Sequence, residues 1–182
     1  MNLVHDLSPT PEGKDDVFHV LVDIPKGSSN KYEIDEDMGY VSLDRVLYHQ
    51  MFYPFDYGSI PMTLAEDGDP VDVCVMVTYP TVPGCVHRVR VIGMLETADE
   101  AGVDPKILAV PIEKVDPRWA EVKTWEDLPE HVRKEIHLHF KEIKKLEGEK
   151  YPKVEIGDFK GVDEATDVIQ KAIEAYNEEH KK

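Results

Sequence analysis

The sequence lacks the marks of disulfide-bonded, zinc-binding and membrane-spanning proteins. Only two cysteines, Cys74 and Cys85, occur among 182 residues, and neither stands in a Cys-x-x-Cys or Cys/His spacing typical of zinc sites. We therefore expect two reduced thiols in the core of a cytoplasmic protein. No apolar run reaches the roughly 20 residues that span a bilayer. The segment from Met1 to Pro11 is polar and lacks the apolar centre of a signal peptide.

Basic residues are also in short supply. The chain has 37 Asp and Glu against 21 Lys and Arg, a net charge of −16. Such a surface repels phosphate backbones and anionic lipid, which argues against nucleic acid and membranes as partners. An anionic substrate would need local compensation by cations. Taken singly, most of these carboxylates need no explanation beyond solubility.

The apolar pattern predicts strands first and helices last. Two apolar stripes at helical spacing, Pro129–Glu147 and Asp163–His180, predict helices. Short strands are predicted over residues 17–24, 31–34, 41–47, 71–77, 85–95 and 107–112. This order favours a β-rich α+β fold, in which a small closed β-barrel is flanked by two C-terminal helices. We expect one domain over residues 1–182, because no linker or repeat divides the chain.

The densest group of carboxylates is Asp67-Gly68-Asp69-Pro70-Val71-Asp72. Glycine permits a tight turn and proline stiffens its exit, while carboxylates this close repel one another unless cations neutralise them. An EF-hand counted from Asp67 would need Glu at its last position, where Thr78 stands, so that calcium loop is excluded. Taken alone, the run also suits an ordinary surface turn.

A second loop, Asp99–Lys106, again sets carboxylates around a glycine and a proline between two predicted strands. The two loops could face each other at one end of the barrel. Ligand sets made only of oxygen select Mg²⁺ or Mn²⁺ over Zn²⁺. Several aspartates also fit a pair of metal ions that drives displacement at phosphorus. His137 and His139 are two apart on a predicted helix and cannot share an ion, so we expect no histidine ligand.

Cations and tyrosines complete the candidate site. The groups suited to phosphate lie near the ends of predicted elements: Lys31, Arg45, Lys106 and Lys144. Each of them could equally be a solvated surface charge. Tyr53 and Tyr57, in Tyr53-Pro54-Phe55-Asp56-Tyr57-Gly58, could bond a phosphate oxygen or simply pack in the core.

With these residues assembled, the sequence resembles the family I soluble inorganic pyrophosphatases over most of its length, roughly Val17 to Tyr151. The Asp-Gly-Asp-Pro-x-Asp run is that family's signature. The other matching segments are residues 24–27 with 30–33, residues 43–45, residues 53–58 and residues 99–106.

The resemblance implies a five-stranded barrel of the OB type that hydrolyses pyrophosphate to two orthophosphates with several Mg²⁺ ions, or Mn²⁺ or other divalent ions, per site. It implies that the metal ligands are Asp67, Asp72, Asp99, Asp104 and Glu33. Asp72 would bridge two ions. Asp69 would be the general base. Phosphate oxygens would be bound by Lys31, Arg45, Tyr57, Lys106 and Lys144, with Tyr53 in support. The family also implies a homo-oligomer, usually a hexamer.

Two positions depart from the family pattern. Asp23 stands where the family usually has Glu, which shortens a supporting carboxylate by one methylene. Ile143 stands where the family usually has Tyr, immediately before Lys144. One hydroxyl contact to phosphate would then be missing, which can cost about 1.5–3 kcal/mol when the partner is charged.

Two other functions remain open from the residues alone. A barrel of this type can bind nucleic acid, but that requires a basic groove, and the charge of −16 disfavours it. A calcium-binding protein without catalysis would use the same carboxylates. Oligonucleotide binding at varied salt tests the first alternative, and phosphate release tests the second.

Overall fold

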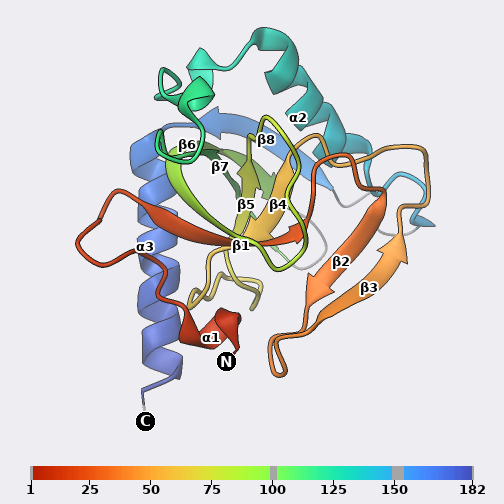
Figure 1. Cartoon of the computed structure of the whole chain (residues 1–182). Helices are drawn as coiled ribbons and strands as arrows, with labels where there is room; N and C mark the ends of the chain where they lie inside the picture. The colour runs from red at the N-terminus through yellow and green to blue at the C-terminus, as the bar shows by residue number, and fades with distance from the viewer. Residues whose placement is uncertain (1, 99–101, 149–153, 182) are drawn as a thin grey trace.

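Five strands close into a ring in the computed structural model, which describes residues 2–98, 102–148 and 154–181. The hydrogen-bonded order is β1-β4-β5-β7-β6, and β1 also pairs with β6, which closes the ring (Figure 1). The bounds are β1 Phe18–Ile24, β4 Asp56–Ser59, β5 Asp72–Val75, β6 Val86–Ala98 and β7 Lys106–Pro111. All neighbours are antiparallel except β5 and β7, which run parallel. The predicted fold class is therefore confirmed.

Other elements surround this ring. Strand β8, Glu155–Lys160, pairs with β6, while β2 (Asn30–Ile34) and β3 (Val41–Val46) form a separate antiparallel hairpin beside the ring (Figure 1). The helices are α1 Leu3–Asp6, α2 Glu130–Glu142 and α3 Val162–Glu179, with short 3-10 turns at Pro117–Trp119 and Trp125–Asp127. No helix in the described ranges is long and apolar enough to cross a membrane.

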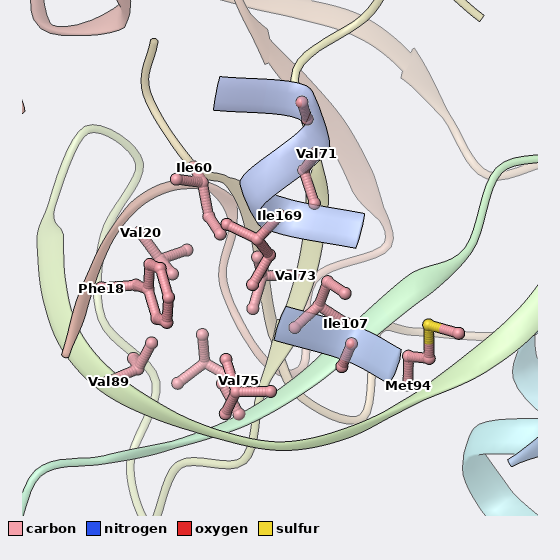
Figure 2. Packing of buried hydrophobic residues seen from close by; sticks show 14 of the residues in the cluster. Phe18, Val20, Ile60, Val71, Val73, Val75, Val89, Met94, Ile107 and Ile169 are labelled. Atoms are coloured by element: carbon pink, nitrogen blue, oxygen red, sulfur yellow. The ribbon is translucent and has the colours of Figure 1, made fainter. Parts of the chain in front are cut away.

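The ring strands bury both of their faces. On β5, Val73 and Val75 join a cluster that includes Ile169 of α3, whereas Cys74 between them joins a second cluster with Ile136 of α2. Figure 2 shows the first cluster, in which the α3 side chain lies among residues of several strands. Because neighbouring side chains on a strand point in opposite directions, such strands must be apolar at nearly every position. The prediction of a central strand within residues 71–77 is confirmed, with the strand itself spanning Asp72–Val75.

Two strands and one helix end differ from the sequence prediction. Strand β4 was not predicted because its Gly58 weakens a strand signal, yet a Cβ there would lie 2.1 Å from the Leu21 carbonyl oxygen, so only glycine permits this pairing with β1. The polar edge strand β8 was not predicted either. Helix α2 ends at Glu142, earlier than residue 147. Both cysteines are free, but only Cys74 is buried, so the prediction of two core thiols holds for one.

Candidate functional site

Most of the predicted site residues meet around one cavity of about 440 Å³. Its wall is built from the hairpin, the signature loop, the start of β7 and the residues at the end of α2. The predicted residues that line it are Lys31, Glu33, Arg45, Tyr53, Tyr57, Asp67, Asp69, Asp72, Asp104, Lys106 and Lys144. Asp99 lies outside the described residues. Acidic groups that are remote along the chain therefore share a cavity with the basic groups expected to face phosphate.

The signature loop, Asp67-Gly68-Asp69-Pro70-Val71-Asp72, forms a turn that leads into β5. Gly68 has a φ of 96°, the Asp69 amide donates to the Asp67 carboxylate at 3.1 Å, and the Ala65 amide donates to the Asp69 carbonyl at 2.8 Å. This turn ends where β5 begins, at Asp72. Since the parallel strands β5 and β7 start at the same edge of the sheet, Asp72 and Lys106 are neighbours. The parallel pairing thus joins the two carboxylate loops.

Lys106 lies between two carboxylates at this edge. Its Nζ donates to Asp72 Oδ2 at 2.6 Å and also to Asp104. Burial by itself would lower the pKa of Lys106, but the two carboxylates outweigh it and raise that pKa above its usual value. Burial raises the pKa of Asp104, and the charge of Lys106 offsets that only in part. The ammonium therefore occupies the charge-compensating position between these two carboxylates.

Asp69 lines this cavity without such a partner among the ion pairs of the described residues. Burial raises the pKa of its carboxyl, and the neighbouring carboxylates of Asp67 and Asp72 raise it further. A carboxylate with a raised pKa holds a proton more readily at neutral pH than an ordinary aspartate does. This side chain is therefore suited to accept a proton.

The hairpin presents two cations held by acidic neighbours. Lys31 pairs with Glu33 and lies 3.3 Å from Asp44, and Arg45 pairs with Asp44 and with Glu147, the latter at 2.9 Å. Neither Asp44 nor Glu147 was predicted. Asp44 directly precedes Arg45, which could have suggested it. Glu147 carried no signal in the sequence, because only folding brings it against Arg45, 102 positions earlier.

Tyr53 and Tyr57 add two uncharged hydroxyl groups to the lining of the cavity. Burial, reinforced by the carboxylate of Asp72, raises the pKa of both Tyr53 and Tyr57, so their hydroxyls stay protonated and can donate hydrogen bonds. The Nζ of Lys106 lies 5.9 Å from the centre of the Tyr57 ring. Cation–π contact of this kind favours an ammonium at the ring face.

Asp23 lies on an adjoining cavity of about 380 Å³ rather than on the first. The two cavities share five residues: Lys31, Glu33, Tyr57, Asp69 and Asp72. Burial and the charge of Asp72 raise the pKa of Asp23 well above its usual value. Asp23 therefore does not line the main cavity, and its supporting role stays a prediction.

The carboxylate oxygens of the cavity are suitable ligands for hard divalent cations, but they are not gathered around a single ion position. Within the described ranges, no three His, Cys, Asp or Glu side chains are grouped tightly enough to enclose an ion. Instead Asp67, Asp72 and Asp104 all line the same cavity, where Lys106 pairs with both Asp72 and Asp104. Carboxylate oxygens are the ligands that Mg²⁺ and Mn²⁺ prefer.

Comparison with known proteins decides the family. The family model described as inorganic pyrophosphatase matches residues 20–177. The chain belongs to the inorganic pyrophosphatase family. The inorganic pyrophosphatase of Aquifex pyrophilus is 48% identical to it over 94% of this chain and 95% of that protein. The inorganic pyrophosphatase of Sulfolobus acidocaldarius is 49% identical over 87% of this chain and 90% of that protein. The crystal structure of inorganic pyrophosphatase from Thermus thermophilus matches with a TM-score of 0.90 at 41% identity, covering 97% of this chain and 99% of that one.

Membership of the inorganic pyrophosphatase family confirms the resemblance drawn from the sequence. Of the two departures from the family pattern, Ile143 lines the main cavity beside Lys144, whereas Asp23 lies in the adjoining one. At this position the cavity is lined by an aliphatic side chain in place of the hydroxyl that the family usually has.

Proposed function

We propose that this protein hydrolyses inorganic pyrophosphate to two orthophosphates. The observation that carries the proposal is a single cavity in which carboxylates face cations. Its lining includes the carboxylates of Asp67, Asp69, Asp72 and Asp104 together with the cations of Lys31, Arg45 and Lys144. A doubly charged metal needs the first group, and a phosphate with several negative charges needs the second. Family membership supports the same reaction.

The family implies dependence on divalent metal, and we propose Mg²⁺ as the ion, several per site. Its ligands would be Asp67, Asp72, Asp104, Glu33 and Asp99, with Asp72 as the bridge. Bound divalent ions would neutralise charge on the phosphates and lower the pKa of a nearby water. With Asp72 and Asp104 as metal ligands, the ammonium of Lys106 would be available to bind a phosphate oxygen.

The chain's own side chains would bind the substrate and move one proton. Asp69 Oδ accepts the proton of the attacking water, for which its raised pKa suits it. Lys31, Arg45 and Lys144 bind and stabilise the leaving phosphate, since positive charge aimed at a developing anion lowers the barrier. Tyr57 donates a hydrogen bond from its neutral hydroxyl, and Tyr53 packs against it, with ring centres 5.5 Å apart.

Phosphate release from pyrophosphate tests the function directly. The purified protein should release two phosphates per pyrophosphate with Mg²⁺, and a chelator should abolish the release. A non-catalytic calcium-binding protein would release none under either condition. Oligonucleotide binding that weakens with salt would favour the nucleic-acid alternative.

We also propose a homo-oligomer, with a hexamer as the expected form. Exposed apolar side chains on β3 and in the segment after it support this, and we call them together the β3 face: Val41, Leu43, Val46, Tyr48 and Phe52. A two-stranded hairpin with an apolar outer face gains stability by covering it. One domain over residues 1–182, a cytoplasmic location and the absence of nucleic-acid and membrane partners remain predictions.

A further inference from the structure

Asp56 is a fully buried carboxylate that lines neither cavity. It begins β4 and directly precedes Tyr57. Successive side chains of a strand point to opposite faces, so Tyr57 faces the cavity while Asp56 points away from it. A buried carboxylate is strongly unfavourable unless it is hydrogen-bonded, so its partners indicate what it stabilises.

The Asp56 carboxylate joins three separate segments to β4. Its Oδ1 accepts from the Lys26 amide at 2.8 Å. Its Oδ2 accepts from the Thr81 amide at 3.1 Å and from the Thr81 hydroxyl at 2.6 Å, and it lies 3.1 Å from Nε2 of buried His87. These contacts hold its pKa below the usual value against the opposing effect of burial. A turn, a loop and the start of β6 are thereby fixed to one strand end.

The turn held by Oδ1 has a defined shape. The Ser28 amide donates to the Pro25 carbonyl at 3.1 Å, and Gly27 between them has a φ of 85°, as a type II β-turn requires. Lys26 therefore occupies the second position of this turn. The Gly27 amide also donates to the Tyr53 carbonyl at 2.8 Å. The turn is bonded on both sides to the segment that ends in Tyr57.

Strand β2 starts two residues after this turn and carries Lys31 and Glu33 into the cavity. The position of these two side chains relative to Tyr57 therefore depends on how firmly the turn is held. The parallel pairing of β5 and β7 positions Asp72 and Lys106 by an independent route.

We propose that Asp56 is a positioning residue for substrate binding. By holding the Lys26 amide it sets where the hairpin places Lys31 and Glu33 against the rest of the cavity. This inference rests on the proposed pyrophosphate hydrolysis, because its readout is the kinetics of that reaction.

The decisive variant is Asp56→Asn, which preserves shape but leaves one acceptor oxygen. In the wild type, Thr81 donates two hydrogen bonds to Oδ2. We therefore expect the side-chain oxygen of the introduced asparagine to take that place. Its NH₂ group then faces the Lys26 amide, and two donors meet where the wild type has a hydrogen bond. We expect KM for pyrophosphate to rise about tenfold, the effect of losing one charge-assisted hydrogen bond. We expect kcat to stay within about twofold, because the group proposed as base lies on another segment.

A second pair of variants removes the donor and leaves Asp56 in place. Lys26→Pro suits the second position of a type II turn and deletes the amide hydrogen. Lys26→Met keeps that hydrogen and deletes only the ammonium, which donates to the Val77 carbonyl at 3.1 Å. We expect KM to rise with Lys26→Pro and to stay unchanged with Lys26→Met. If Asp56→Asn fails to fold, this pair decides the matter.

The matched control is Asp116→Asn, which removes the same charge from a carboxylate that accepts from the Thr78 hydroxyl at 2.5 Å. Its KM should equal that of the wild type. The inference is overturned if the wild type is active and both Asp56→Asn and Lys26→Pro keep its KM, or if Lys26→Met raises KM as much as Lys26→Pro. A wild type that releases no phosphate would instead refute the proposed function, and this inference with it.

Discussion

The ammonium of Lys106 lies 2.6 Å from Oδ2 of Asp72, at the edge where β5 and β7 begin side by side. This ion pair has two consequences of opposite sign. It neutralises a carboxylate that a metal would use, and it holds a cation that a phosphate would use. If the proposed roles hold, metal binding and substrate binding would be coupled through this one side chain.

Replacing Lys106 should separate these effects. In Lys106→Met, Asp72 and Asp104 lose their neutralising partner, so Mg²⁺ should bind the substrate-free protein about tenfold more tightly. KM for pyrophosphate should rise by about tenfold or more, because one charged contact is lost. Calorimetry with Mg²⁺ and steady-state kinetics measure the two quantities. Lys114→Met, at an exposed lysine that lines neither cavity, is the control. Weaker Mg²⁺ binding by Lys106→Met would contradict this reasoning.

Asp69→Asn should lower kcat by about 100-fold or more, in the range expected for loss of a general base. Mg²⁺ affinity, measured by calorimetry, should change little, because the proposed ligands are other carboxylates. Asp158→Asn makes the same change at an exposed carboxylate of β8 and should leave kcat unaltered. Full activity in Asp69→Asn would show that another group takes the proton.

Ile143→Tyr should lower KM for pyrophosphate. Ile143 lines the cavity beside Lys144, so a hydroxyl at this position could donate to the phosphate that Lys144 binds. One hydrogen bond to a charged group corresponds to about 1.5 kcal/mol or more, which is a decrease in KM of about tenfold. Leu146→Tyr, a few residues further on at an exposed side chain, is the matched control. Equal KM values for wild type and Ile143→Tyr would mean that a hydroxyl at this position does not contribute to substrate binding.

His139 should make the protein less stable in acid. Its ring is buried against Tyr53 and Phe55, and burial, aided by the charge of His49, lowers its pKa to about 3. The unfolded chain takes up a proton near pH 6.5 and the folded one does not, so stability falls as the pH drops below that value. Between pH 6.5 and pH 5 the loss of stability amounts to about 1.6 kcal/mol.

His139→Phe should remove this part of the pH dependence. Chemical denaturation at pH 5, 6 and 7.5 measures the slope, which is insensitive to a constant packing penalty from the larger ring. The control is His137→Phe, at a nearby histidine that is only half-buried, and it should keep the wild-type slope. Identical slopes for wild type and His139→Phe would show that the buried imidazole takes its proton without unfolding.

Charges on the β3 face should prevent assembly if this face joins subunits. In the double variant Val41→Lys with Tyr48→Lys, two exposed apolar side chains become cations that are costly to bury. Light scattering on a sizing column should show a fall in molar mass toward that of the single chain, 20.7 kDa. Val115→Lys, at an exposed valine elsewhere, should leave the mass unchanged. An unaltered mass for the double variant would place the interface on another surface.

The sequence by itself determined the chemical groups and most of the elements. The strand that contains Val73 and the stripe around Ile169 were predicted because periodic apolar residues report which faces are buried. The aspartates of the signature loop were predicted because their spacing and the flanking Gly68 and Pro70 are local properties. Such features depend only on residues near one another in the chain.

The tertiary structure alone decided which of these groups meet. Strand β4 exists because Gly58 lets two backbones approach, which no local pattern announces. Arg45 pairs with Glu147, and Lys106 lies between Asp72 and Asp104, because strand order and the parallel pairing bring distant loops together. Contacts of this kind depend on the path of the chain in space, and a one-dimensional pattern does not contain it.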